Sequence, residues 1–198
     1  MGISMDEKKR SLDLSDAAEP LWVAQVLHFW FEELSPAGWF AKSDDIDAQI
    51  RERFLVLHEQ LSVTDVAGFF SKREILAAVV VLDQFSRNLF RGSPQAFSAD
   101  PIARRLARLA VEKGLDKFMK PEERVFLYLP FEHSESIDDQ QTSVALIAAL
   151  GSDDWTRYAI AHREIIERFG RFPHRNAVLN RVSTPDEIEM LKDPAKSF

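Results

Sequence analysis

Apolar residues recur at helical spacing along most of the chain. Ile46, Ile50 and Phe54 follow one another at intervals of four, which places their side chains on one face of a helix. Residues 152–169 repeat the pattern, and no stretch alternates apolar and polar residues for long, as a half-buried strand would. The sequence also has no Asn-Gly or Asp-Gly hairpin turn. The pattern predicts an all-α chain, a bundle of about eight antiparallel helices joined by short loops.

Helix start and stop signals divide this pattern into segments. Residues 71–74 (SKRE) and 184–187 (TPDE) are capping boxes, in which the first and last side chains each bond an unpaired backbone amide. Gly114 and Gly170 stand at positions where glycine commonly ends a helix. Pro130 lies inside an apolar segment. We expect it to end or kink its helix, because proline has no amide hydrogen.

Residues 75–85 are apolar on nearly every side, which is typical of a helix surrounded by other helices. The longest apolar run in this segment has eight residues, far fewer than the ~20 that span a bilayer. The polar N-terminus shows no secretory signal, so we expect a cytoplasmic protein. We expect one helical domain at 15–192, between a disordered lead at 1–14 and a frayed tail at 193–198.

Composition removes several classes of function. The 198 residues include no cysteine, which excludes a disulfide scaffold, a cysteine nucleophile and cysteine-ligated metal sites. Lysine and arginine number 25 against 32 acidic residues, a net charge of −7, so nucleic acid is not an expected partner. There is no Gly-rich phosphate loop, no nucleophile elbow and no HExxH pair. The sequence predicts no cofactor, no metal ion and no membrane partner.

A polar cluster follows the buried segment, in the sequence LDQFSRNLFRG at 82–92. Asp83 and Arg87 are four residues apart and can pair on one side of a helix. Asn88 and Arg91 lie on the neighbouring row with Gln84. Polar groups that emerge from a core must bond to one another or to a ligand. Both a structural network and a ligand site are therefore open.

A second stretch, residues 126–135, runs from apolar residues into Glu132 and His133. These side chains can serve as acid and base or as metal ligands, or His133 can simply bond a backbone group beside Pro130. His162 faces the apolar side of its own helix, where it is either a core residue or part of a cavity wall.

The third stretch, RFGRFPHRN at 168–176, holds three arginines and one histidine in an acidic protein. Guanidinium groups offer forked donors that suit carboxylates and phosphates. The stretch is therefore either an anion-binding loop or a set of salt bridges to neighbouring helices.

These three stretches together resemble a family. They are similar to the three hallmarks of the mostly bacterial domain-of-unknown-function family 924. The second hallmark is YLPFEHSE at 128–135 followed by Asp139-Gln140, and the third is followed by residues 183–185. VLHFWF at 26–31 is similar to the family's opening segment. The sequence departs from the family's usual Asp at His28 and its usual Pro at Ser86. The resemblance covers roughly residues 22–191. It implies a tetratricopeptide-like helical fold and implies no activity.

Three hypotheses for function follow. In the first, the polar stretches converge on one pocket that binds an anionic small molecule or a peptide carboxylate. Its lining would be Asp83, Arg87, Asn88, Arg91, Arg171, His174, Arg175 and Asn176. In the second, a hydrolase or lyase acts on a small acidic substrate with Glu132, His133 or His162 as acid and base. In the third, the protein is an interaction module or homodimer, and the polar motifs only hold helix ends.

Overall fold

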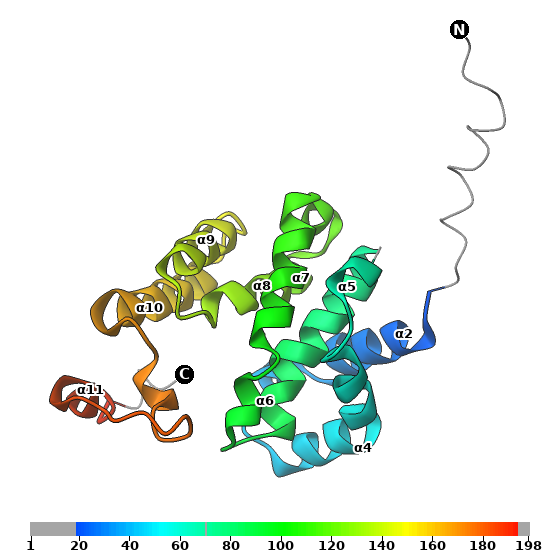
Figure 1. The fold of residues 1–198 in the computed structure, drawn as a ribbon. Coiled ribbons are helices and arrows are strands. Elements are labelled where there is room, and N and C mark those ends of the chain that lie inside the picture. The colour runs from blue at the N-terminus through cyan, green and yellow to red at the C-terminus, as the bar shows by residue number, and fades with distance from the viewer. Residues whose placement is uncertain (1–18, 70, 194–198) are drawn as a thin grey trace, which may run out of the picture.

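A computed structural model describes residues 19–69 and 71–193, and no β-strand occurs among them. The predicted lead at 1–14 and residues 194–198 of the predicted tail lie outside the described residues. The all-α prediction is confirmed (Figure 1). The α-helices are α2 (Leu21–His28), α3 (Pro36–Trp39), α4 (Asp44–Leu61), α5 (Lys72–Val79), α6 (Ser86–Leu89), α7 (Asp100–Glu112), α8 (Pro121–Glu132), α9 (Ile137–Ala148), α10 (Asp153–Phe169) and α11 (Pro185–Met190).

Shorter helical turns join these elements. Two of them have π-helical geometry, η1 (Phe29–Glu33) and η3 (Val80–Phe85). The others are 3₁₀ turns: η2 (Val66–Gly68), η4 (Pro94–Phe97), η5 (Leu115–Phe118) and η6 (Pro173–Arg175).

The local signals in the sequence set most helix ends. Both predicted capping boxes form, at Ser71 with Glu74 and at Thr184 with Glu187. Gly170 ends α10 with φ 67°, in the left-handed region that glycine adopts without strain. Pro130 behaves differently from a strict stop, because α8 continues through it and ends at Glu132. Glu132 is therefore the last residue of α8, and His133 caps its C-terminal end.

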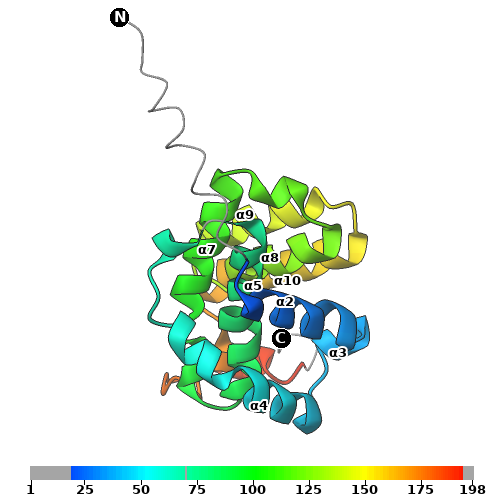
Figure 2. The ribbon, with the colours of Figure 1, turned by 90° about the vertical axis from the view of Figure 1, so that its right-hand side faces the viewer.

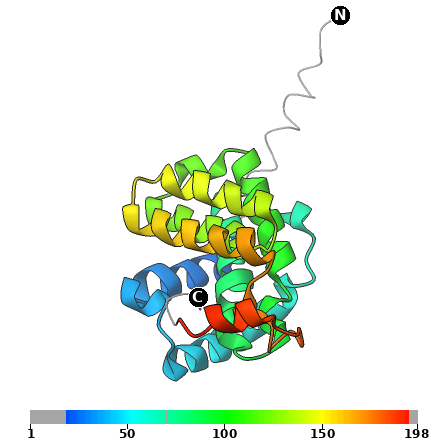
Figure 3. The ribbon, with the colours of Figure 1, turned by 90° about the vertical axis from the view of Figure 1, so that its left-hand side faces the viewer.

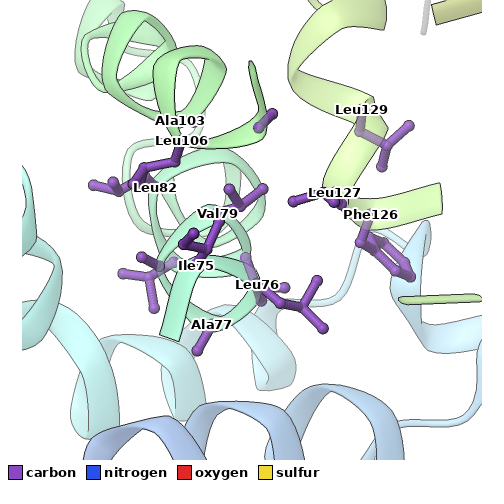
Figure 4. Packing of buried hydrophobic residues seen from close by; sticks show 14 of the residues in the cluster. Ile75, Leu76, Ala77, Val79, Leu82, Ala103, Leu106, Phe126, Leu127 and Leu129 are labelled. Carbon is purple, nitrogen blue, oxygen red and sulfur yellow. The ribbon is translucent and has the colours of Figure 1, made fainter. Parts of the chain in front are cut away.

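The core is built around α5 and η3, which form one continuous helix. Every residue from Ile75 to Phe85 is buried. Figure 4 shows Ile75, Leu76 and Ala77 pointing to different sides of this helix. It packs against α2, α7 and α8, and η3 packs against α4. Because it is buried on every side, the predicted central helix is confirmed. Burial of one such aliphatic side chain stabilises the fold by about 1.5–3 kcal/mol.

The sequence did not predict the π turn in this helix. A π turn inserts one residue, which rotates all later side chains by about 100° around the axis. The polar positions that follow therefore face different neighbours from those of a regular helix.

The remaining helices lie in two groups, on opposite sides of the central helix (Figure 1). Figure 2 shows α2 and α4 across the side of α5 that is turned away from α9 and α10. Figure 3 shows α9 (yellow) and α10 (orange) side by side, with α11 (red) below them. The chain between α10 and α11 returns toward α6 and α7 (Figure 1). None of the described helices has the length and apolar character needed to cross a membrane.

Candidate functional site

The first and second polar stretches meet at Asp83, which lies within η3 in the interior of the fold. Its side chain is fully buried. Nδ1 of His133, at the end of α8, lies 2.9 Å from Asp83 Oδ1, and the Gln84 amide donates to Oδ2 at 2.6 Å. Burial opposes ionisation, but His133 and Arg87 outweigh it and hold the pKa of Asp83 below its usual value. The ionised carboxylate accepts, so His133 donates through Nδ1 and leaves Nε2 to other partners.

The first and third stretches meet at Asp100, in the first turn of α7. Arg87 donates to both carboxylate oxygens of Asp100, at 2.7 and 3.0 Å, and a weaker contact of 3.7 Å joins it to Asp83. Arg175 approaches the same carboxylate from η6, with Nη1 3.9 Å from Oδ2. Both guanidinium groups lie over the ring of Phe97, at 4.8 and 4.7 Å from its centroid. The predicted pair of Asp83 and Arg87 is present, but Asp100 is the closer partner.

Arg175 is the least satisfied charge in this cluster. Only 9% of its side chain is exposed. Its guanidinium lies over Phe172 as well as Phe97, and it makes no side-chain hydrogen bond to any described residue. Burial and the neighbouring charge of Arg87 lower its pKa to about 10, so it still carries its charge at neutral pH.

His174 lies next to Arg175 and is also unsatisfied. Its Nδ1 atom is buried and has no hydrogen-bond partner among the described residues. The ring packs on Phe172, with centroids 5.5 Å apart. Burial and the charge of Arg175 lower the pKa of His174 to about 4. The imidazole is therefore neutral at physiological pH.

Glu132 and His162 form a second acid–histidine pair beside Asp83. His162 Nδ1 lies 3.2 Å from Glu132 Oε1 and 2.9 Å from the Tyr158 carbonyl. A carbonyl oxygen only accepts, which assigns the proton to Nδ1. Burial lowers the pKa of His162 to about 3, whereas burial and the charge of Asp83 raise that of Glu132 to about 8. The rings of His162 and His133 are 6.3 Å apart, so the two pairs adjoin.

Four of the predicted ligand residues lie elsewhere. Asn88 and Arg91 both donate to Asp47 of α4, at 2.7 Å and 2.8 Å. Arg171 makes two bonds to Glu187 of α11, at 2.6 and 2.9 Å, and Asn176 donates to Ser183 and, at 3.3 Å, to Glu187. These contacts join α6 to α4 and the third stretch to α11.

A cavity of about 420 Å³ lies beside the pair of Arg171 and Glu187. It is lined by Arg168, Phe169, Arg171, Thr184, Asp186 and Glu187. Two of its charged lining groups, Arg171 and Glu187, already form a bidentate pair. Arg171 also keeps 29% of its side chain exposed, against 9% for Arg175. The buried arginine of the third stretch that lacks side-chain hydrogen bonds among the described residues is therefore Arg175, outside this cavity.

Sequence reasoning missed several partners. Asp100 was not among the predicted site residues, and Phe97 and Phe172 carried no signal beyond their apolar character. Glu135 was also missed. It accepts two bonds from Arg181, at 2.8 and 3.0 Å, and one from the Phe172 amide. In the described part of the chain, no three His, Asp or Glu side chains are grouped so that they could hold a metal ion.

The sequence profile of a family described as bacterial proteins of unknown function (DUF924) matches residues 26–195. The chain belongs to the DUF924 family. A solved structure of a protein of unknown function from Agrobacterium tumefaciens is 38% identical, with a TM-score of 0.81. The match covers 86% of this chain and 96% of that one. No curated protein matches.

The family resemblance of the three polar stretches is thus confirmed. The tetratricopeptide-like arrangement that it implied stays a prediction.

Proposed function

We propose that this DUF924 protein binds an anion, carried by a small molecule or by a peptide carboxylate, at Arg175. The observation that carries the proposal is the buried Arg175 guanidinium without a hydrogen bond. A buried donor that stays unsatisfied costs about 1–3 kcal/mol, and a charged one costs more. An anion that accepts these N–H groups recovers that free energy on binding.

Neighbouring groups support the same site. Arg87 lies over the same phenylalanine ring as Arg175 and adds positive charge that Asp100 holds in place. His133 and His174 each present a ring nitrogen that has no partner among the described residues. Fixed donors of this kind bind without the loss of side-chain freedom that a flexible site would suffer.

A thermal-shift titration tests this proposal. We would titrate the full chain with acetate, benzoate, inorganic phosphate, sulfate and carboxylate-ended peptides. A ligand at 100 times its Kd stabilises the folded state by about 2.7 kcal/mol, which raises Tm by roughly 5–10 °C for a chain of this size. Arg175→Gln should abolish the shift.

The matched control is Arg168→Gln, because Arg168 belongs to the same stretch but is exposed. It should keep the full shift. If no anion stabilises the wild-type protein, or if both variants lose the shift equally, the proposed site is wrong.

The adjoining pairs Asp83–His133 and Glu132–His162 favour a second candidate, a hydrolase or lyase that acts on a small acidic substrate. Glu132, with its pKa raised to about 8, is protonated at neutral pH and can act as an acid. NMR of each stabilising anion during incubation with the protein would detect turnover. On this hypothesis Glu132→Gln abolishes turnover and retains the thermal shift. Unchanged anions throughout the incubation would contradict it.

A further inference from the structure

The charges around Arg175 limit which anion the proposed site accepts. Resting on that site, we propose that its ligand is a monocarboxylate and that one proton enters with it, held on His133 between Asp83 and the bound carboxylate.

Charge balance is the first argument. Arg87 and Arg175 contribute two positive charges, and Asp83 and Asp100 contribute two negative ones. Glu132, with a pKa of about 8, is mainly neutral. A monocarboxylate therefore brings this group to −1, and a phosphate dianion would bring it to −2. Like charges placed together away from water repel one another strongly, so the two aspartates select against the dianion.

The placement of the guanidinium is the second argument. Arg175 lies over the rings of Phe97 and Phe172, at 4.7 and 4.5 Å from the two centroids. Nε of Arg175 is buried and has no hydrogen-bond partner among the described residues, and Nη1 reaches Asp100 only at 3.9 Å, so its N–H groups are open to a ligand. A carboxylate is planar and accepts two parallel bonds from a guanidinium group.

The third argument concerns where a proton can be stored. His162 donates through Nδ1 to the Tyr158 carbonyl, and burial disfavours a charge on it. His174 is disfavoured by burial and by the charge of Arg175. His133 is the histidine whose Nδ1 already donates to an ionised carboxylate, at 2.9 Å.

A proton on Nε2 of His133 would give it a second donor. With Asp83 on one side and the ligand carboxylate on the other, an imidazolium is stabilised from both ends. The same proton restores the group from −1 to neutrality.

The groups near His133 include both positive and negative charges. Arg87 and Arg175 place two positive charges in the same cluster, and Glu132 is mainly neutral. The ligand carboxylate adds the negative charge that shifts this balance. The charged and titratable groups of this cluster come from η3, α6, α7, α8, the segment between α8 and α9, α10 and η6: Asp83, Arg87, Asp100, Glu132, Glu135, His162, His174 and Arg175.

Isothermal titration calorimetry measures the proton directly. Benzoate and acetate would be titrated into the full chain at pH 7.5 in two buffers with different ionisation enthalpies, with inorganic phosphate and sulfate as dianions. We expect an uptake near one proton per bound monocarboxylate. The Kd for benzoate should then weaken by up to about tenfold per pH unit above neutrality. Both dianions should bind more weakly than benzoate.

Two histidine variants separate this role from general electrostatics. His133→Gln should lose the proton uptake and give a Kd that changes little with pH. The matched control is His174→Gln, which removes a histidine of the same cluster and should retain the uptake. If His133→Gln does not fold, ¹⁵N NMR of the wild-type histidine rings replaces it, with protonation of His133 expected on addition of benzoate.

The outcomes distinguish the two proposals. If a monocarboxylate binds through Arg175 without proton uptake, if phosphate binds as tightly, or if another histidine takes the proton, this inference is overturned and the anion site stands. If no anion gives an Arg175-dependent signal, both fail.

Discussion

Arg87 and Arg175 lie over the same ring of Phe97, and they differ in how their charge is met. Arg87 has both oxygens of Asp100 and a further contact to Asp83. Arg175 reaches Asp100 only at 3.9 Å and makes no side-chain hydrogen bond within the described part of the chain. The two arginines therefore differ in how many of their donors have acceptors, and Nε of Arg175 is buried without one.

The peripheral pairs extend this comparison. Arg91 with Asp47, and Arg171 with Glu187, are bidentate and connect elements that are far apart in sequence. Their geometry resembles that of Arg87 with Asp100 and not that of Arg175. The three motifs thus contain two kinds of arginine, and substitutions should separate them by their effect on stability.

The largest loss of folding stability is expected on substitution of Asp100. Asp100→Asn removes the carboxylate that holds Arg87 and leaves two guanidinium groups together without it, which should lower the free energy of unfolding by about 3–5 kcal/mol. Urea denaturation measures the loss. The matched control is Asp154→Asn, since Asp154 also lies in the first turn of a helix but is 74% exposed. Equal losses in the two variants would mean that only the helix dipole is affected.

A smaller loss of folding stability, which depends on pH, is expected on substitution of Glu187. Hydrogen bonds from Arg171 lower the pKa of Glu187 to about 2, against 4.5 for an ordinary glutamate. The folded pKa is depressed, so this stabilisation is complete above about pH 4.5 and is lost as the pH falls toward 2.

Glu187→Gln should therefore lower the free energy of unfolding by about 2 kcal/mol at pH 7, and by progressively less as the pH falls from 4.5. Urea titrations at pH 7, 4 and 2.5 test this. A difference between wild type and variant that does not change with pH would contradict the assignment of the charge to Glu187.

The sequence was informative wherever a structural feature depends on neighbouring residues. The capping boxes at Ser71 and Thr184 and the stop at Gly170 depend on bonds within a few residues, and all three are confirmed. The buried helix was also predictable, because its apolar character on every side requires neighbours whichever helices supply them.

The composition of the site was less predictable for a physical reason. Asp100 and Arg175 meet only because α10 and the chain after it return to the first turn of α7, and such packing leaves no local pattern. Asn88 and Arg91 were predicted to line one pocket with Arg87, whereas they bond to Asp47 of α4, an element whose packing against this turn leaves no local pattern either.

The smallest change in stability is expected at Arg175, where the comparison is sharpest. Arg175→Met removes contacts to two aromatic rings, each worth roughly 0.5–1 kcal/mol, but it also removes a buried charge without hydrogen bonds, which costs about as much or more. The free energy of unfolding should change by less than about 1 kcal/mol. Arg87→Met, the matched change over the same ring, leaves Asp100 and Asp83 without their main cation and should be far more damaging. Urea denaturation of the two variants side by side measures the difference. Losses of similar size would mean that Arg175 supports the fold as Arg87 does, and its unsatisfied donors would then no longer argue for a ligand.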